Sequence, residues 1–208
     1  MILCWAAKGG SGTTVVACSL ALAAVQNGPA TLVDLAGDCA TALGLPESHG
    51  PGVTDWLASP TAGAADLHRL STPIRDDARL IPQGNGVPLD GRWVRLVEAL
   101  GEPGHVIVDA GTGPPRSELR GAASQSLLVI RPCFLALRRA QQLTARPTGV
   151  VLVNEPGRAL TATDIEGALG VAVVAEVHYD PAVARAVDAG LLAARMPRSL
   201  MLSLRNAA

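Results

Sequence analysis

Lysine is almost absent from this 208-residue sequence: of its 17 basic residues only Lys8 is a lysine, and the rest are arginines. Aromatic residues are also scarce, at 2% of the chain, so the core has to be built mainly from Ala, Val, Leu and Ile. Hydrophobic residues nevertheless make up 49% of the chain and charged residues 17%. This composition allows a large core, which excludes an intrinsically disordered protein.

The sequence has no excess of charge of either sign and no long apolar run. Its formal net charge is −1 and it contains no basic block, which argues against binding to nucleic acid. The apolar stretch at 15–25 is interrupted by Ser19 and is shorter than the ~20 residues that a membrane span needs. The N-terminus lacks the basic segment of a signal peptide. We therefore expect a soluble, cytoplasmic protein with at most peripheral attachment to a membrane.

No cysteines have the spacing of a metal site or of a redox motif. The sequence contains no C-x-x-C, and its cysteines are isolated from one another. In a reducing cytoplasm such cysteines behave as small apolar side chains. We expect all of them to be buried without binding metal: Cys4, Cys18, Cys39 and Cys133.

Short apolar runs alternate with helical patterns along the whole chain, without an internal repeat or a long linker. This alternation predicts a single doubly wound α/β domain over residues 1–208, with a mostly parallel central sheet flanked by helices. The least regular stretch, 44–91, is rich in Gly, Pro, Ser and Asp and predicts surface loops and short helices. The expected strands are 2–6, 30–35, 105–109, 126–130, 149–153 and 171–177, with 79–82 weaker. The expected helices are 14–27, 53–58, 92–100, 135–145, 162–169 and 182–189.

A glycine-rich loop, K-G-G-S-G-T-T at 8–14, lies between the first expected strand and the first helix. Glycines let a backbone turn tightly so that its N–H groups approach anionic oxygens, and the helix N-terminus adds positive potential. The Thr14 hydroxyl stands where a phosphate-binding loop ligates Mg²⁺. An ordinary loop of this kind has Gly and Lys where this chain has Ala7 and Thr13. The alternative is a strand-to-helix turn that binds nothing.

This loop resembles the deviant Walker A motif, K-G-G-x-G-K-[ST], of the MinD/ParA group of ATPases. The resemblance implies that Lys8 crosses a dimer interface to the nucleotide of a second copy. The form with Thr at the second lysine position looks like the CpaE/TadZ branch, whose members help to position Tad (Flp) pilus machinery. That branch often carries a receiver-like domain before the ATPase, and this chain begins at the first strand.

Acidic residues follow two of the expected strands. Asp34 and Asp109 each end an apolar run, and carboxylates at the carboxyl edge of a parallel sheet face the ligand and suit Mg²⁺. In the resemblance, Asp109 matches the Walker B aspartate. The second aspartate of the family's D-x-D segment, which positions the attacking water, aligns with Ala36, and Asp38 lies two residues further on. Asn154 matches the residue that reads the adenine base.

The resemblance therefore implies an ATP- and Mg²⁺-dependent homodimer with weak ATPase activity. We expect catalytic roles for Lys8 and Asp38 and metal binding by Thr14, Asp34 and Asp109. Thr13 cannot supply a phosphate-binding charge, so we expect hydrolysis to be slow. The expected nucleotide-binding residues are Lys8, Gly9, Gly10, Ser11, Gly12, Thr13, Thr14 and Asn154.

The cellular role remains open at this point. The chain is expected to position or regulate a cell-envelope machine such as a pilus, through a protein partner, from the cytoplasm, the inner face of the membrane or a cell pole. The alternatives are a non-hydrolysing scaffold of the same fold and a ParA- or MinD-type partitioning or division-site protein. A different P-loop enzyme, such as a kinase or ligase, lacks an acceptor-site signal. The segment 197–208 is expected to close the core rather than bind a membrane, and Arg138 and Arg139 to form a solvated helix face rather than a partner surface.

Overall fold

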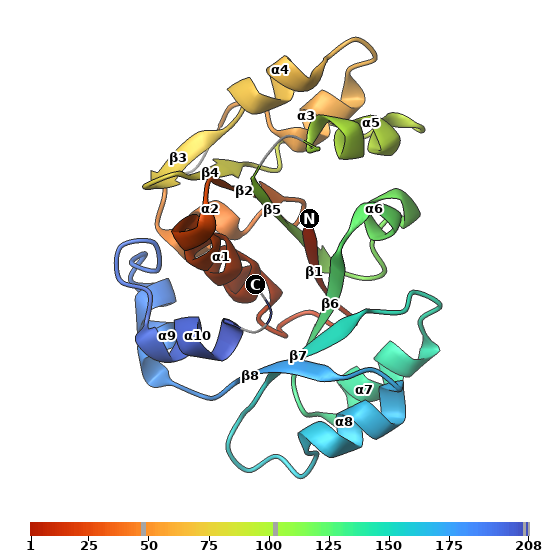
Figure 1. Ribbon diagram of the computed structural model, residues 1–208, viewed down its shortest axis with the longest axis vertical. Helices are drawn as coiled ribbons and strands as arrows, with labels where there is room; N and C mark the ends of the chain where they lie inside the picture. Colours follow the sequence, from red (N-terminus) through yellow and green to blue (C-terminus); the bar gives the residue numbers. More distant parts are fainter. Residues whose placement is uncertain (47–48, 102–103, 206, 208) are drawn as a thin grey trace.

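The computed structural model describes residues 1–46, 49–101, 104–205 and 207. Within them, eight strands form one sheet in the order β3-β4-β2-β5-β1-β6-β7-β8 (Figure 1). All neighbouring pairs are parallel except β3 and β4, which form an antiparallel edge. The strands are β1 (Ile2–Ala6), β2 (Ala30–Asp34), β3 (Thr72–Arg75), β4 (Ala78–Ile81), β5 (His105–Thr112), β6 (Gln125–Ile130), β7 (Gly149–Val153) and β8 (Val173–Val177).

Helices cover both faces of this sheet and bury a separate apolar cluster on each (Figure 1). One face carries α1 (Thr13–Ala24), α2 (Cys39–Leu43), α9 (Pro181–Asp188) and α10 (Arg198–Leu204). The other face carries α3 (Val53–Ala58), α4 (Ala64–Arg69), α5 (Arg92–Ala99), α6 (Ser117–Ala122), α7 (Phe134–Gln142) and α8 (Ala162–Leu169). The predicted doubly wound α/β fold with a mostly parallel central sheet is therefore confirmed.

The central strands form because nearly every side chain in them can be buried. In β1, Leu3 and Trp5 face one cluster and Cys4 faces the other, as the two-residue repeat of a strand requires. The indole N–H of Trp5 donates to the Ser126 hydroxyl on β6 at 3.0 Å, so its only polar atom is satisfied inside the core. This pattern explains why the apolar runs alone predict the strands in the middle of the sheet.

Strand β5 is longer than predicted. The sequence suggests an end at Asp109, but pairing with β1 continues to Thr112, which lies opposite Ala6, and the Gly113 amide donates to the Ala6 carbonyl at 2.8 Å. The segment after Asp109, predicted as a turn, is therefore strand as far as Thr112. Gly111 hides this continuation from a pattern based on apolar residues.

The prediction for residues 44–91 is wrong in part. The short helices are present, and the weaker strand expected at 79–82 is β4. The segment also holds the unpredicted strand β3 and several buried side chains, including Trp56, Leu57 and Leu80. Strand β3 escapes prediction because it lies at the edge of the sheet, where its side chains are mostly exposed and give no buried apolar run.

The cysteines are mostly where the sequence places them. Cys4, Cys18 and Cys39 are fully buried, but Cys133 is only half-buried. The expectation of burial is wrong for Cys133, because its sulfur caps α7 by accepting the Ala136 amide at 3.4 Å. A cap position lies at the end of a helix, where some exposure to solvent remains.

The C-terminal helix α10 closes the core, as predicted. Leu200 and Leu204 are 1% and 0% exposed and belong to the same cluster as α1, whereas Leu202 is 58% exposed. Among the described residues, no helix has the length and apolar character that a membrane crossing needs.

Replacement of Leu200 by Ala should lower the free energy of unfolding by about 3 kcal/mol, because the site loses buried methyl groups and keeps a cavity. The matched control is Leu202→Ala on the same helix, where an exposed side chain should cost less than about 0.5 kcal/mol. Urea denaturation at equilibrium measures both values. Equal effects of the two substitutions would show that α10 does not seal the core.

Candidate functional site

A glycine loop at 8–12 joins β1 to the N-terminus of α1. The Ser11 hydroxyl donates to the Lys8 carbonyl at 2.8 Å and closes the loop on itself. Gly12 caps the helix at φ 91°, in the left-handed region that favours glycine. Gly9 and Gly10 are exposed, so an anion can approach this backbone closely. Their amides and the first turn of α1 form a site of positive potential.

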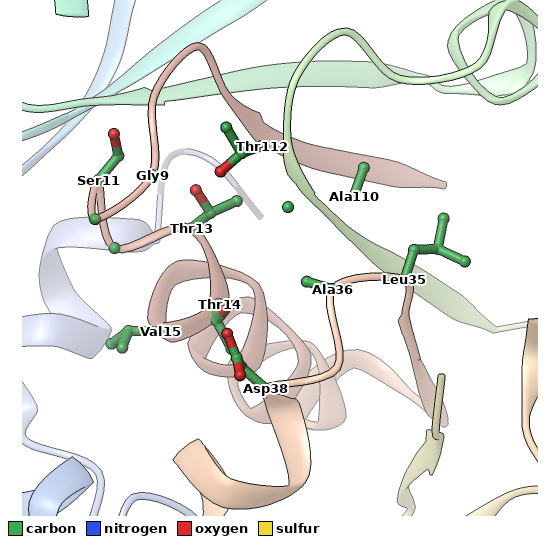
Figure 2. A pocket seen from close by; sticks show the side chains of 13 residues that line it. Gly9, Ser11, Thr13, Thr14, Val15, Leu35, Ala36, Asp38, Ala110 and Thr112 are labelled. Carbon is green, nitrogen blue, oxygen red and sulfur yellow. The ribbon is translucent and has the colours of Figure 1, made fainter. Parts of the chain in front are cut away.

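This loop borders a cavity of about 540 Å³ at the carboxyl edge of the sheet (Figure 2). Three segments form its walls: the loop after β1, the loop after β2 and the last residues of the neighbouring strand β5. The carboxyl edge of parallel strands is where open α/β sheets bind their ligands. The lining residues are Gly9–Val15, Leu35, Ala36, Asp38 and Ala110–Thr112.

The Asp34 carboxylate is 2% exposed and organises the wall that follows β2. Its Oδ1 accepts the amides of Ala36 and Gly37 at 2.9 and 2.6 Å, and its Oδ2 accepts the Cys39 amide at 2.9 Å. These bonds fix the loop and start α2. This structural role is not evident from the sequence, and metal binding by Asp34 remains a prediction.

The Asp109 carboxylate lies beside Asp34, its register partner on the neighbouring strand, and is completely buried. Burial raises the pKa of Asp109 above its ordinary value, and the nearby Asp34 adds to the rise. Hydrogen bonds from Thr14, Gly111 and Cys39 favour the ionised form and therefore oppose this rise in pKa. A cation stabilises a buried carboxylate that is held next to a second one. Such a pair of carboxylates is an environment that a divalent ion prefers.

A thiol adjoins these two carboxylates. The Cys39 sulfur donates to Asp109 Oδ2 at 3.6 Å, and ligand atoms of Asp34, Cys39 and Asp109 lie within 4.8 Å of one another. A hydrogen bond with Cys18 and burial raise the pKa of the Cys39 thiol well above its usual value. The thiol therefore remains protonated and acts as a donor to Asp109.

The two residues considered for positioning a water molecule lie differently in the cavity. Asp38 is exposed, lines the cavity and precedes α2 without capping it through its side chain. Ala36 faces β5, where a Cβ on Gly111 would lie 3.1 Å from the Ala36 Cβ (Figure 2). Residues 36 and 111 therefore lie close together, and a side chain at position 111 would crowd Ala36.

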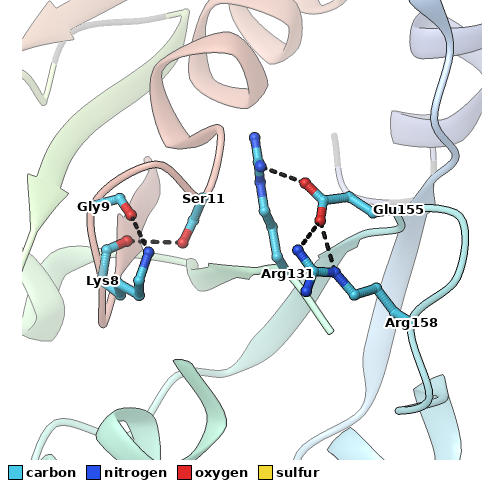
Figure 3. A network of polar contacts seen from close by, with 6 residues as sticks. All are labelled: Lys8, Gly9, Ser11, Arg131, Glu155 and Arg158. Carbon is cyan, nitrogen blue, oxygen red and sulfur yellow. Dashed lines mark hydrogen bonds and ion pairs between the residues drawn. The ribbon is translucent and has the colours of Figure 1, made fainter. Parts of the chain in front are cut away.

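The lone lysine does not reach into this cavity. The Lys8 ammonium donates to the Gly9 carbonyl at 3.1 Å, and Lys8 lies outside the cavity lining, whereas the neighbouring Thr13 is part of it (Figure 3). A role for Lys8 across an interface stays a prediction.

A second cavity, of about 330 Å³, adjoins the first and shares Gly12 and Val15 with it. Asn154 lines this cavity and donates to Glu176 at 2.7 Å, which leaves its amide oxygen free of that contact. Tyr179 stands at the rim and is 61% exposed. Apolar side chains of β7, β8 and α9 make up much of the remaining wall: Val153, Val177, Val183 and Val187.

Two functional candidates are missed by the sequence. Thr112 lines the first cavity because β5 is longer than predicted. Arg131 lines the second cavity at the end of β6, where it forms an ion pair with Glu155, which also binds Arg158 (Figure 3). A basic residue directly after a strand that neighbours β1 is the signal that would have identified Arg131.

The residues at the two cavities fit a nucleotide with a divalent cation. The glycine loop offers N–H donors to phosphate oxygens, while Thr14 and the two aspartates offer the hard oxygen ligands that Mg²⁺ prefers. The second cavity continues from the same loop and has the largely apolar walls that suit a base. These features are typical of the class of phosphate-binding-loop proteins, and nucleotide binding by this chain stays a prediction.

The comparisons with solved structures agree with this class. A ParA family ATPase from Chlorobium tepidum superposes with a TM-score of 0.78 at 21% identity, covering 98% of this chain and 94% of that one. The MinC:MinD complex of Aquifex aeolicus gives 0.75 at 19% over 91% and 85%. MinD of Pyrococcus horikoshii, complexed with Mg-ADP, gives 0.77 at 16% over 97% and 91%. The chain matches no protein-family model and none of the curated proteins. It has the fold of the MinD/ParA P-loop ATPases.

Replacement of Asp109 by Asn should stabilise the nucleotide-free protein increasingly as the pH rises. The folded-state pKa of Asp109 lies above its unfolded value. Below the ordinary carboxyl pKa the group is protonated in both states, so it costs the folded state nothing. As the pH rises from there through the raised pKa, the folded protein loses stability because its carboxyl group is harder to ionise. Urea unfolding in the presence of a chelator, between about pH 4 and pH 8, measures the difference between variant and wild type.

The control for this titration is Asp38→Asn, which removes an exposed carboxylate from the wall of the same cavity. The stability difference for that variant should change much less with pH. A difference for Asp109→Asn that is constant or falls as the pH rises would contradict the assigned electrostatics.

Proposed function

We propose that this chain is an ATP- and Mg²⁺-binding protein of the MinD/ParA type that switches between monomer and dimer with its nucleotide. The observation that carries this proposal is the glycine loop at the N-terminus of α1, which opens on a cavity beside two buried aspartates of β2 and β5. Residues 1–208 would act as a single domain. The Mg-ADP complex of the structurally similar Pyrococcus horikoshii MinD supports the choice of ligands.

In this proposal the loop residues Lys8–Thr14 surround the phosphates with backbone N–H groups, while Asn154 contacts the base in the second cavity. Thr14 would bind Mg²⁺ directly, and Asp34 and Asp109 would hold its water ligands. The bound cation would screen the two carboxylates from each other and lower the cost of burying them.

Hydrolysis is proposed to be slow. Thr13 places a neutral hydroxyl where a lysine would stabilise charge on the phosphates, and Ala36 has no group to orient water. Asp38 is the exposed carboxylate of the same wall and the candidate for that task. A scaffold that binds nucleotide without hydrolysing it is the alternative within the same fold.

Lys8 is proposed to contact the nucleotide of a second copy across a two-fold interface. Its ammonium lies outside the lining of its own phosphate cavity, and a two-fold axis would let one lysine from each chain serve both sites. Without nucleotide the facing lysines would repel each other, so dimerisation should depend on ATP.

The dimer proposal predicts that Lys8→Ala leaves the fold intact and abolishes ATP-dependent dimerisation, because the charge that joins the two phosphate sites is lost. Lys8→Arg should weaken the dimer, since a planar guanidinium does not occupy the space of an ammonium. Light scattering after size exclusion, with Mg²⁺ and either ATP or ADP, measures the mass. Arg95→Ala, an exposed charge on α5, is the control. A Lys8→Ala protein that still dimerises only with ATP would contradict the shared site.

Replacement of Ala36 by Asp should raise the rate of ATP hydrolysis by about 10- to 100-fold, because the lining of the phosphate cavity then holds a carboxylate able to orient water. The companion variant is Asp38→Ala, measured in the same phosphate-release assay. A rise in turnover for the first variant with little effect of the second supports the missing carboxylate. If Ala36→Asp adds nothing and Asp38→Ala abolishes turnover, Asp38 already performs the task and the assignment to Ala36 is wrong.

The cellular role proposed is to position or regulate a cell-envelope machine, with the CpaE/TadZ branch and Tad pilus assembly as the particular hypothesis. It rests on the K-G-G-S-G-T-T form of the loop. The MinC:MinD complex of a structurally similar protein supports a protein partner in general. A partitioning or division-site role is the alternative, and the near-neutral charge disfavours one that requires binding to DNA. Recruitment to a membrane or a pole would then come through the partner.

A further inference from the structure

The phosphate cavity lacks a cation from its own loop. Residues 9–14, all of which the structure describes, carry no positive charge, and the Lys8 ammonium donates to the Gly9 carbonyl instead. Backbone N–H groups and a helix N-terminus favour an anion, but three phosphates carry several negative charges. A nucleotide bound by one chain therefore needs a cation from another element.

Arg131 is placed to supply that cation. It follows β6, the strand next to β1, and it lines the second cavity together with Gly12 and Val15 from the loop and the first turn of α1. Figure 3 shows its side chain extending from the end of β6 to the Glu155 carboxylate. The Arg131 Nε is buried and has no hydrogen-bond partner, so the guanidinium keeps an unused donor.

The ion pairs around Arg131 leave a positive charge without a counterpart. Arg131 and Arg158 both bind Glu155, one to each carboxylate oxygen, so two cations share one anion. The hydrogen bond from Arg158 lowers the pKa of the Glu155 carboxyl, with help from the charge of Arg131. Because Arg158 would continue to neutralise Glu155, Arg131 can turn toward a second anion without leaving a carboxylate unpaired.

We propose that Arg131 binds the phosphate chain of the nucleotide within its own subunit and replaces the charge that Thr13 lacks. This inference rests on the proposed ATP-binding function and adds a phosphate-contacting residue to it. Two nitrogens of the planar guanidinium can donate to two oxygens of one phosphate group, while the third nitrogen stays bound to Glu155. The two cavities share Gly12 and Val15, so the cavity that Arg131 lines adjoins the phosphate cavity at the loop.

The test separates a phosphate contact from a contact with the base. Calorimetry measures the affinity of wild type and Arg131→Gln for Mg-ATP and for tripolyphosphate, which has no base or ribose. Loss of a charge-assisted contact should weaken both ligands about 10-fold or more. Arg95→Gln on α5, which removes an exposed arginine paired with Glu98, is the control and should change both affinities by less than about 3-fold, as expected for an exposed ion pair.

A double-mutant cycle with Thr13→Lys tests whether Arg131 replaces the positive charge that Thr13 lacks. Restoring a lysine in the loop should make Arg131 largely dispensable, so Arg131→Gln should weaken binding much less in the Thr13→Lys protein than in wild type. Equal losses in the two backgrounds would show that Arg131 does not replace the missing charge. Weakened ATP binding with unchanged tripolyphosphate binding would assign Arg131 to the base and overturn the inference.

The outcomes also distinguish this inference from the function on which it rests. If wild type binds Mg-ATP and Arg131→Gln binds it equally well, only the inference fails. If wild type binds neither Mg-ATP nor tripolyphosphate, the proposed function fails, and the role of Arg131 fails with it. Thermal unfolding of each variant without ligand shows whether the substitution has disturbed the fold.

Discussion

The site is organised by two carboxylates buried side by side, one at the end of β2 and one within the second half of β5. Asp34 and Asp109 are register partners, almost without exposure, in a part of the core where charge is costly. Their neighbours are arranged to compensate. Backbone amides surround Asp34, while Thr14, Gly111 and Cys39 donate to Asp109. The loop after β2, the start of α2 and the first turn of α1 all take their positions from these bonds.

The negative and positive side chains around the two cavities occupy separate places. The carboxylates lie beneath the glycine loop, the loop itself offers only backbone dipoles, and the cations Lys8 and Arg131 are held elsewhere by neutral or acidic partners. Such an arrangement suits a ligand that carries its own divalent cation toward the aspartates and its anionic chain toward the loop. In our proposals, Lys8 and Arg131 serve different subunits: Lys8 crosses an interface, and Arg131 remains in its own site.

The phosphate cavity and the second cavity are also joined through the backbone. Helix α2 begins at the loop that Asp34 holds and ends at Gly44, which packs directly against Gly190 after α9. A Cβ on Gly44 would lie 1.8 Å from the Gly190 carbonyl oxygen, so the contact tolerates no side chain at that position. Since α9 forms part of the wall of the second cavity, α2 connects the loop that Asp34 holds to that wall.

The sequence by itself determined the layered fold, the glycine loop and the placement of two acids near strand ends. These features depend on local rules: buried parallel strands read as continuous apolar runs, and glycine is needed where the backbone turns toward an anion. Only the tertiary structure decided the continuation of β5 to Thr112, the edge strand β3 and the capping role of Cys133. It also decided that Asp34 is surrounded by amides and that Arg131 shares a cavity with Gly12. These facts depend on contacts between segments far apart in the chain, and no local pattern of residues records such contacts.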